Sequence, residues 1–432
     1  GACSPRLIIF DPVTYRLSGA DGMSQNKPIE EQIAILMQAV EMGDEKLKEA
    51  MQAELKEKLV NSVETGEPLR VYCGYDPTSP DLHLGHTVTM RKLKQFQDLG
   101  HQAIFVIGTF TALVGDPSDK DRARPRLSHD QVMENAKTYT DQAFKILDRE
   151  KTEVRYNHEW LSELSMEQII EMASLFTVQQ FLVRDNFSKR FEKGDPIWLH
   201  EFFYGVLQGY DATMLKADVQ LGGTEQLFNL LAGRKLQEAM GLNPQVALTT
   251  PVLVGTDGYM RMAKSTGNYI GIDETPEEMY GKVMSLPDSA MMNYYRLVTR
   301  LSPAEIAEIE RGLNEGKLHP RDVKMRLARE IVAIYQGNES VEPAEAAFRR
   351  VFQEHEDPEE MAEYSIGSER NVVDVMVDSG LVSSKSEARR LIQQNGVRLE
   401  GELLDDPGMD LEISQPVVLK VGKRRFLRLM PE

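Results

Sequence analysis

Hydrophobic positions at helical spacing open the interpretable part of the chain. Ile33, Met37 and Val40 recur three or four residues apart, and a stretch rich in Glu, Lys and Leu follows them. This period is typical of amphipathic helices, so residues 23–68 are predicted to form N-terminal helices. Residues 1–22 precede the pattern and are expected to be a disordered extension.

Two short apolar runs then bracket another helical pattern. The runs are residues 69–73 and 103–108, and residues 90–96 between them carry apolar side chains at helical spacing. A strand–helix–strand order with a glycine-rich loop at each crossover predicts a parallel sheet, which binds ligands at the carboxyl ends of its strands. We therefore predict an α/β, Rossmann-like domain over residues 69–275.

Several helix starts are marked by capping pairs, in which a Ser or Thr precedes a Gln or Glu by three positions. After residue 275 the helical pattern continues alone, so residues 276–355 are predicted to form an all-helical domain. An acidic run around a proline follows and holds too little apolar surface to fold alone, which predicts a linker over residues 356–368. The capping pairs are Ser128 with Gln131, Ser165 with Gln168, Thr275 with Glu278 and Ser302 with Glu305.

The last segment, residues 369–432, has a different pattern. It combines short helical faces with apolar runs at residues 397–399 and 417–421. This combination predicts a small, separate α+β domain.

Composition narrows the class of protein. The 432 residues are 41% hydrophobic and 27% charged, as expected of a globular chain with two or three domains. The formal net charge is −18, so any contact with nucleic acid must come from local basic patches. Only Cys3 and Cys73 are present, which excludes a disulfide framework and a cysteine-based zinc site and favours the cytoplasm. The apolar runs are too short for a membrane span or a signal sequence, so no membrane association is expected.

Two histidines open the helix that follows the first strand. His83 and His86 flank Gly85 at a helix N-terminus, where free N–H groups and partial positive charge attract anions. The missing side chain at Gly85 lets a nucleotide approach the backbone, and the rings can donate to phosphate oxygens. Taken alone, the pattern more often marks histidines that only cap or pack against a helix.

Cationic side chains from two other segments could complete a phosphate site. Lys264 and Ser265 lie in the glycine-rich loop RMAKSTGNY, while Lys120 and Arg124 follow the sequence GDPS. Ordinary solvated loops would carry the same residues. If these segments converge on the two histidines, they form an ATP site.

Three polar residues farther along share a helical spacing. Tyr204, Gln208 and Asp211 are four and seven positions apart, so on a helix they lie on one face. Such a face can line a pocket with a phenol, an amide and a carboxylate. The alternative is a core tyrosine with a solvated or capping carboxylate.

Together these motifs resemble those of class I aminoacyl-tRNA synthetases. HLGH at residues 83–86 is similar to the HIGH motif of that class, and RMAKS at residues 261–265 is similar to its KMSKS motif. Within the class, residues 28–432 look like a bacterial tyrosyl-tRNA synthetase. That closer resemblance rests on YCGYDPT at 72–78, GDPS at 115–118, the Tyr204, Gln208 and Asp211 face, and LGGTEQ at 221–226.

The resemblance implies an enzyme that activates L-tyrosine with ATP and Mg²⁺ to tyrosyl-adenylate, then transfers tyrosine to the 3′-terminal adenosine of tRNA(Tyr). It implies that Tyr72 and Asp211 bind the phenol, that Asp116, Tyr204 and Gln208 hold the ammonium, and that Gln226 lies near the carboxylate. The implied ATP-binding residues are Cys73, Gly74, Asp76, Gly85, Gly223, Glu225, Arg261 and Met262. The implied catalytic residues are Thr78, His83, His86, Lys120, Arg124, Lys264 and Ser265.

Three positions depart from the family pattern. Arg261 stands in place of the first Lys of KMSKS, Ala263 in place of its first Ser, and Glu225 in place of an Asp near the ribose. An arginine cannot reproduce the compact ammonium of lysine, so these departures bear on the rate more than on the type of reaction.

The C-terminal domain resembles an S4 RNA-binding domain. Ser384 with Glu387 is a further capping pair, and Lys385, Arg389 and Arg390 lie on the short helix that it starts, where they can meet phosphates. A solvated face is the alternative, because acidic and basic residues nearly balance in this domain. By resemblance, the helices of residues 276–355 contact the anticodon region, the protein is a homodimer, and it binds no metal of its own.

Two alternatives stay open on the sequence. A tryptophanyl-tRNA synthetase shares both signature motifs but lacks the Tyr204, Gln208 and Asp211 face and the S4 tail. A noncatalytic RNA-binding relative could retain the fold, and the altered RMAKS loop is compatible with that role.

Overall fold

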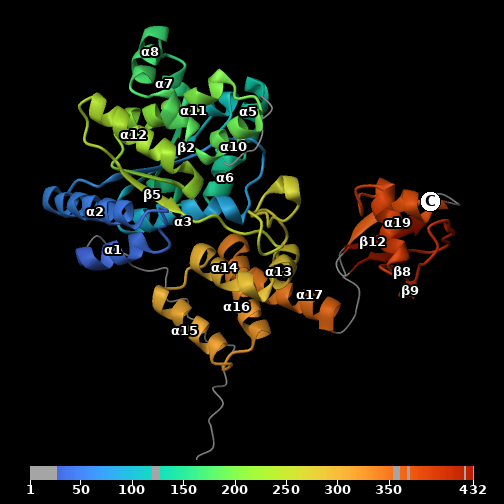
Figure 1. The fold of residues 1–432 in the computed structure, drawn as a ribbon. Coiled ribbons are helices and arrows are strands. Elements are labelled where there is room, and N and C mark those ends of the chain that lie inside the picture. Colours follow the sequence, from blue (N-terminus) through green and yellow to red (C-terminus); the bar gives the residue numbers. More distant parts are fainter. Residues whose placement is uncertain (1–26, 119–126, 354–360, 367–369, 423–424, 432) are drawn as a thin grey trace, which may run out of the picture. The chain divides into compact units, whose positions relative to one another are not determined.

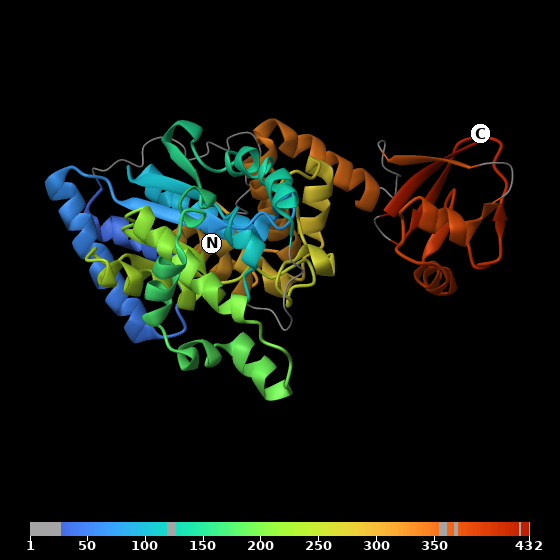
Figure 2. The same ribbon diagram turned by 90° about the horizontal axis from the view of Figure 1, so that it is seen from above.

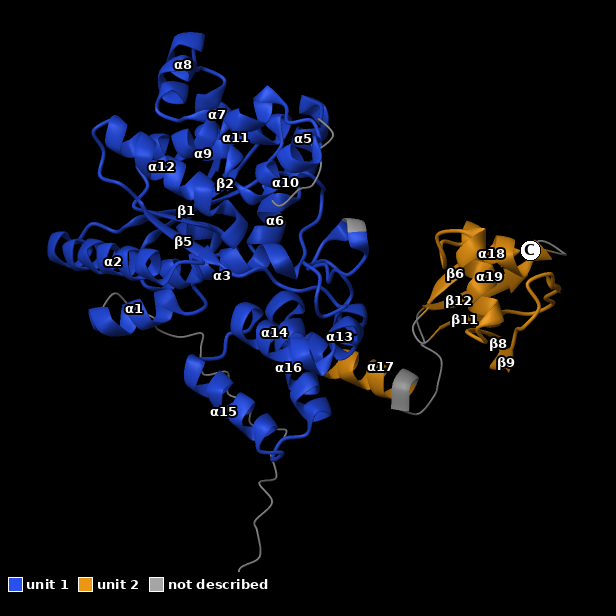
Figure 3. Ribbon diagram, in the orientation of Figure 1, with its two compact units in different colours: residues 1–341 blue, residues 342–432 orange. Residues whose placement is uncertain are grey.

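The computed structural model describes residues 27–118, 127–353, 361–366, 370–422 and 425–431. The chain divides into two compact units, residues 1–341 and 342–432, which Figure 3 colours separately. The extension predicted at residues 1–22 lies outside the described residues.

A five-stranded parallel sheet forms the centre of the first unit, and its strand order is β3-β2-β1-β4-β5. The buried residues of its inner strands occupy successive positions, because helices cover both faces of such a sheet. The two strands predicted from apolar runs are present, each shifted by one or two residues at its ends. The strands are β1 Arg70–Tyr75, β2 Gln102–Ile107, β3 Thr152–Tyr156, β4 Val219–Gly223 and β5 Val246–Thr250.

Helices lie on both sides of this sheet. α3 (Leu84–Asp98) packs on β1, β2 and β4, whereas α12 (Leu227–Ala239) packs on β4 and β5 and pairs with α11 (Leu199–Met214). Figures 1 and 2 show α3 on the opposite side of the sheet from α11 and α12, as right-handed crossovers require. The Rossmann-like prediction is confirmed.

The N-terminal helices are also present. α1 (Ile29–Met37) packs against α3, and α2 (Glu45–Thr65) packs against β5. The Asp44 carboxylate starts α2 by accepting from the N–H groups of Lys46 and Leu47.

Short helices connect β2 to α11. Ser128 and Ser165 start two of them with the reciprocal capping bonds predicted from the sequence. The helices are α4 Thr111–Val114, α5 His129–Ala136, α6 Tyr139–Ala143, α7 His158–Leu161, α8 Met166–Ser174, α9 Val178–Leu182 and α10 Asp185–Lys193.

After residue 275 the described elements are helical as far as residue 353, as predicted. Thr275 caps α13, and Ser302 forms a reciprocal capping box at α15. The boundary between the two units falls at Val341, inside the predicted helical domain of residues 276–355. The helices are α13 Pro276–Met284, α14 Met291–Val298, α15 Pro303–Asn314, α16 Pro320–Gln336 and α17 Val341–Gln353.

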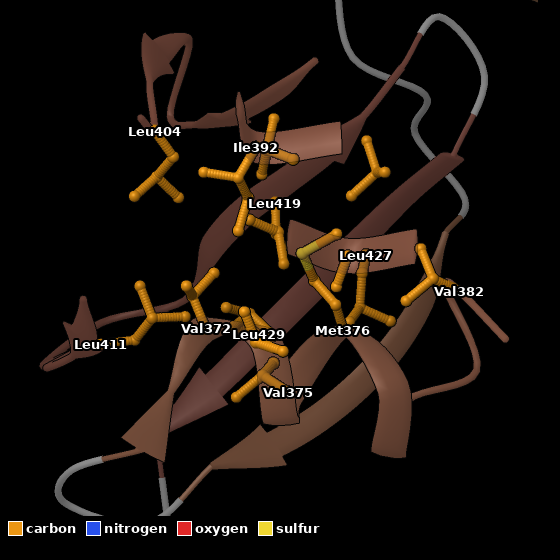
Figure 4. Packing of buried hydrophobic residues seen from close by; sticks show 14 of the residues in the cluster. Val372, Val375, Met376, Val382, Ile392, Leu404, Leu411, Leu419, Leu427 and Leu429 are labelled. Carbon is orange, nitrogen blue, oxygen red and sulfur yellow. The ribbon is translucent and has the colours of Figure 1, made fainter. Parts of the chain in front are cut away.

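The second unit contains a sheet in the order β6-β12-β11-β8-β9, a two-stranded ladder of β7 with β10, and two helices beside them. Figure 4 shows its core, where Val372, Met376, Ile392, Leu419 and Leu427 pack together. The elements are β6 Ala362–Ile366, β7 Arg370–Asn371, α18 Val372–Asp378, α19 Lys385–Gln393, β8 Val397–Leu399, β9 Glu402–Leu403, β10 Asp410–Leu411, β11 Val417–Val421 and β12 Arg425–Pro431.

The linker prediction is wrong for residues 362–366, because they form the edge strand β6. β6 pairs in parallel with β12, Ile366 enters the core, and Glu363 lies 3.6 Å from the Arg428 guanidinium. An edge strand buries only alternate side chains, so an acidic composition did not prevent this segment from joining the sheet.

Among the described residues, no helix has both the length and the apolar character needed to cross a bilayer.

Candidate active site

A cavity of about 390 Å³ opens at the carboxyl ends of the parallel strands. It lies at the switch point between β1 and β4, from which the strand order runs in opposite directions, and such crevices bind ligands in α/β folds. Residues from the YCGYDPT, HLGH, GDPS, LGGTEQ and RMAKS motifs and from the Tyr204, Gln208 and Asp211 face line it. They include Cys73, Gly74, Asp76, Thr78, His83, Gly85, His86, Asp116, Tyr204, Gln208, Asp211, Gly223, Glu225, Gln226, Arg261, Met262 and Lys264.

Two other candidate residues, Tyr72 and Ser265, are not among those that line the cavity. Tyr72 is buried behind the cavity wall, packed with Ile104 and Trp160. Ser265 lies in the 3-10 turn Lys264–Thr266. Lys120 and Arg124 lie outside the described residues, so their convergence on the cavity stays a prediction.

The two histidines both cap α3 and line the cavity. His83 Nδ1 accepts from the Gly85 N–H (3.1 Å), and His86 Nδ1 accepts from the His83 N–H (3.1 Å). Burial is the main cause that lowers the pKa of His83 to about 2, and His86, Lys264 and Arg261 act in the same direction, so its ring is neutral. Because Nδ1 is an acceptor, the proton of that neutral ring is on Nε2, which makes Nε2 a hydrogen-bond donor.

Gly85 is needed for this arrangement. A Cβ atom at this position would lie 2.9 Å from Cε1 of the His83 ring. The glycine therefore lets the His83 ring fold back over the first turn of α3, in addition to leaving room for a ligand.

The RMAKS loop is joined to the HLGH segment. Lys264 Nζ lies 2.9 Å from Asp81 Oδ2, two residues before His83, and the Leu84 N–H donates to the Ile270 carbonyl (2.9 Å). The two signature motifs, about 180 residues apart in sequence, therefore meet on one side of the cavity.

Two of the departures from the family pattern contact each other. Arg261 Nη2 lies 3.2 Å from Glu225 Oε1, and both residues line the cavity. The larger guanidinium and the longer carboxylate side chain together bridge from the RMAKS loop to the turn after β4.

Asp211 occupies a buried polar site on α11. Its Oδ1 accepts from Trp160 Nε1 (2.7 Å) and its Oδ2 from Asn157 Nδ2 (3.2 Å). Burial raises the pKa of Asp211 to about 7, although both hydrogen bonds act in the opposite direction. Burial and the Asp211 charge both raise the pKa of the Tyr72 phenol, whose OH is 3.5 Å from the Gln208 carbonyl one turn before Asp211.

A second carboxylate, Asp116, is held by a turn and by an amide. Its Oδ1 accepts from the Ser118 N–H (2.8 Å), and its Oδ2 accepts from Gln226 Nε2 (2.7 Å). Asn229 Nδ2 donates to Gln208 Oε1 (3.1 Å) and to Gln226 Oε1 (2.9 Å), which links two helices to this turn.

Tyr204 and Asp76, which the resemblance assigns to different ligands, are hydrogen-bonded. The Tyr204 OH donates to Asp76 Oδ2 (2.9 Å), and Thr111 Oγ1 donates to Asp76 Oδ1 (2.7 Å). Asn157 Nδ2 also donates to Thr111 Oγ1 (3.0 Å). A continuous set of hydrogen bonds therefore runs from Tyr204 through Asp76, Thr111 and Asn157 to Asp211.

Sequence reasoning missed Asn157, Trp160, Thr111 and Asn229. None of them lies in a motif, and apart from Asn229 with Gln226, three positions apart, no short spacing relates them to the cavity residues that they contact. Only Trp160 carried a signal, because a buried indole usually pairs its N–H with an acceptor.

The basic residues of the second unit differ in their surroundings. Lys385 Nζ lies 2.7 Å from Asp374 Oδ1, whereas Arg389 and Arg390 are exposed on α19. Within the described part of the chain, no cluster of three or more His, Cys, Asp or Glu side chains could hold a metal ion.

Comparisons with known proteins agree on one family. A family described as "tRNA synthetases class I (W and Y)" matches residues 64–353, and the S4 domain family matches residues 370–417. The tyrosine–tRNA ligase of Moorella thermoacetica is 52% identical over 377 residues, which are 87% of this chain and 91% of that protein. The tyrosine–tRNA ligase of Thermotoga maritima is 49% identical over 87% of this chain and 93% of that protein.

Solved structures show the same fold at lower identity. A C-terminally truncated mitochondrial tyrosyl-tRNA synthetase of Aspergillus nidulans superposes with a TM-score of 0.60 at 22% identity, covering 76% of this chain and 94% of that chain. The tyrosyl-tRNA synthetase of Archaeoglobus fulgidus, complexed with L-tyrosine, gives 0.58 at 23% identity over 73% and 99%. With the sheet, the paired signature motifs and the relatives in agreement, the chain belongs to the tyrosine–tRNA ligases of the class I aminoacyl-tRNA synthetases.

Proposed function

We propose that the protein activates L-tyrosine with MgATP to form tyrosyl-adenylate and pyrophosphate, and then transfers tyrosine to the 3′-terminal adenosine of tRNA(Tyr). The observation that carries this proposal is the single cavity in which Asp211, Asp116, the HLGH histidines and Lys264 meet. Its carboxylates suit the polar ends of tyrosine, and its donors and cations suit a triphosphate.

Tyrosine recognition is divided between the two carboxylates. Asp211 is fixed by the donors Trp160 and Asn157, and its remaining lone pairs accept from the phenol, with Tyr72 beside it. Asp116 provides the negative charge that an α-ammonium requires. Tyr204, Gln208 and Gln226 complete that end of the pocket.

ATP lies along the glycine-rich strand ends and the start of α3. His83 Nε2 is a neutral donor for a phosphate oxygen, and Lys264 can exchange its contact with Asp81 for the triphosphate. Cys73, Gly74, Asp76, Glu225 and Gly223 take the ribose side, and a Cβ at Gly223 would lie 2.3 Å from the Glu225 carboxylate. Mg²⁺ enters with ATP as part of the substrate.

The chemistry needs placement and charge rather than a protein nucleophile. The tyrosine carboxylate attacks the α-phosphate in line, and pyrophosphate leaves. The donors and cations stabilise the charge that grows on the phosphate oxygens. Cys73 cannot serve as a nucleophile, because burial raises the pKa of its thiol to about 11 and its Sγ donates to the Leu221 carbonyl (3.2 Å).

Neither alternative function is supported. The curated relatives that are about 50% identical to this chain over most of its length are tyrosine–tRNA ligases. This argues against tryptophan as the substrate and against a noncatalytic role. Amino-acid-dependent exchange of pyrophosphate into ATP tests both points, because only tyrosine, and not tryptophan or phenylalanine, should support it.

A matched pair of variants tests the phosphate end. Lys264→Ala should slow tyrosine-dependent exchange by about 10²-fold, the effect of removing one well-placed charge from a transition state, with little change in tyrosine binding. Lys282→Ala is the control, because Lys282 also lies beside the Tyr269 ring but pairs with Glu274 and is absent from the cavity wall. An unchanged exchange rate in Lys264→Ala would remove this residue from the mechanism.

The second unit is proposed to bind tRNA through α19, where Arg389 and Arg390 face solvent. The helices from α13 onward are proposed to meet the anticodon region. Replacing both arginines by Glu should raise the KM for tRNA in aminoacylation and leave pyrophosphate exchange unchanged. Equal tRNA kinetics in this variant would rule out that face.

A second copy of the chain is the proposed partner, and the cytoplasm, which supplies ATP and tRNA, is the proposed location. Large apolar side chains are exposed along the segment from α8 to the start of α11, and a surface of this kind normally marks an interface. Light scattering should show a dimer for the wild type and a monomer for the double variant Phe191→Glu with Leu199→Glu. The exposed residues are Met166, Ile170, Val178, Val183, Phe191, Trp198 and Leu199.

A further inference from the structure

A buried arginine that no motif includes lies directly behind the Asp116 turn. Arg184, between α9 and α10, is only 9% exposed. Its Nη2 donates to Ser118 Oγ (2.7 Å), and its Nη1 is buried without a hydrogen-bond partner. A buried arginine with an unused donor is costly to fold, so it calls for an explanation beyond packing.

Asn186, two residues after Arg184, holds the same turn. Asn186 Nδ2 donates to the Pro117 carbonyl (2.8 Å), and the Arg184 guanidinium lies 4.6 Å from the centre of the Phe228 ring. Residues at the α9–α10 junction therefore hydrogen-bond to Pro117 and Ser118 on the side away from the cavity. The Phe228 ring of α12 packs against the guanidinium and fixes its position.

The position of Ser118 in turn fixes the Asp116 carboxylate. The Ser118 N–H donates to Asp116 Oδ1 (2.8 Å), so a shift of Ser118 would rotate the carboxylate away from Gln226. Burial lowers the pKa of Arg184, and the Asp116 charge opposes that change. Arg184 itself does not line the cavity.

We infer that Arg184 is a positioning residue for amino-acid binding: through Ser118 it fixes the Asp116 carboxylate where the α-ammonium of the substrate docks. The inference rests on the proposed function and extends it to a residue outside the cavity. Affinity for the ammonium should depend on Arg184, whereas affinity for the phenol and for ATP should not.

Two tyrosine analogues separate these contributions. Tyrosinol keeps the phenol and the ammonium but lacks the carboxylate, and 3-(4-hydroxyphenyl)propionate keeps the phenol and the carboxylate but lacks the ammonium. Their inhibition constants against tyrosine-dependent exchange should be measured in the wild type, Arg184→Met, Arg184→Lys and Ser118→Ala. Lys189→Met is the matched control, because it removes an exposed cation from α10, the helix that Arg184 precedes.

We expect Arg184→Met to weaken the binding of tyrosine and tyrosinol by about tenfold, by analogy with the lower end of the losses seen when the partner behind a metal-ligating side chain is removed. The propionate and the KM for ATP should stay within about twofold of the wild type, as should every constant of Lys189→Met. The inhibition constants of Arg184→Lys should lie between those of the wild type and those of Arg184→Met, because lysine keeps the charge but not the planar contact with Ser118 and Phe228. Ser118→Ala should shift the same constants in the same direction, and it provides the test if the Arg184 variants do not fold.

Three results would overturn the inference. Equal losses for tyrosinol and the propionate would make Arg184 a purely structural residue. A loss confined to the propionate would mean that Arg184 recognises the carboxylate, and unchanged constants in Ser118→Ala would break the link through the turn. Failure of the wild type to bind tyrosine or tyrosinol would instead refute the proposed function.

Discussion

Exchanging one oxygen of the Asp211 carboxylate for nitrogen tests the phenol site with the smallest change in shape. Both Asp211 oxygens accept hydrogen bonds, from Trp160 Nε1 (2.7 Å) and from Asn157 Nδ2 (3.2 Å). In Asp211→Asn one of these donors must face an amide NH₂. The Trp160 indole can only donate, so the new carbonyl turns toward it and the NH₂ faces Asn157.

The size of the effect follows from this mismatch. Asn157 cannot flip without loss, because its Oδ1 already accepts from the Phe110 N–H (2.9 Å). The hydroxyl of bound tyrosine meets the same NH₂ and becomes a buried donor without an acceptor, which costs about 1–3 kcal/mol in the bound state alone. At about 1.4 kcal/mol for each factor of ten, kcat/KM for tyrosine should fall roughly 5- to 150-fold. Phenylalanine has no hydroxyl to place, so its kcat/KM should fall less and the selectivity ratio should shrink.

Steady-state pyrophosphate exchange with tyrosine and phenylalanine measures this ratio. Because burial raises the pKa of Asp211 to about 7, the wild type carries a carboxylate at pH 8 and mostly a neutral acid at pH 6. The difference between wild type and variant should therefore be larger at pH 8. The double variant Asp211→Asn with Asn157→Asp exchanges donor and acceptor between the two positions and should recover part of the loss.

Two outcomes would refute the reasoning. An unchanged selectivity ratio in Asp211→Asn would mean that Asp211 does not recognise the phenol. A double variant no better than the single one would show that the mismatch with Asn157 is not the cause.

Three further predictions concern ion pairs and a buried lysine. Arg261→Lys and Glu225→Asp should each raise the KM for ATP a few-fold. The effects of the two changes on the free energy of ATP binding should deviate from additivity in the double variant by up to about 1 kcal/mol, as expected for a partly exposed ion pair. Strictly additive effects would show that the two side chains are not coupled. Glu201→Gln should lower the free energy of unfolding by about 3–5 kcal/mol in urea titrations, because it leaves the buried Arg190 charge unpaired. Replacing both residues by apolar ones should lower it by less. A urea midpoint for Glu201→Gln equal to that of the wild type would contradict this. Burial lowers the pKa of Lys92 from 10.5 to about 7 in the folded protein, so between these pH values the unfolded chain binds one proton that the folded chain does not. The free energy of unfolding of the wild type, relative to that of Lys92→Met, should therefore rise with pH from about 7 to 10.5. A difference that does not change with pH would contradict this.

Much of the cavity could be predicted because its residues lie at the ends of recognisable elements. Apolar runs located β1 and β2, and the carboxyl ends of parallel strands meet at one edge of a sheet. HLGH was therefore placed correctly at the start of α3. Helical periodicity put Tyr204, Gln208 and Asp211 on one face of α11, and all three line the cavity.

The second unit shows where composition misleads. An acidic run predicted a linker, but residues 362–366 complete a sheet because β12 offers them a free edge and Ile366 finds a core. Whether a segment folds depends on the partner that it meets, which its own composition does not specify.

The sequence by itself determined the order of the elements and the faces of the helices, because these follow from local periodicity and from capping over three or four residues. Its motifs named most of the cavity residues through their resemblance to a family. Only the tertiary structure decided which side chains hold them. Asn157 and Trp160 fix Asp211, Arg184 grips Ser118, and the two departures at positions 225 and 261 contact each other. Each of these contacts joins segments from 36 to 66 residues apart, and a hydrogen bond of this kind leaves no period in the sequence, because it depends on where the folded core brings two unrelated segments.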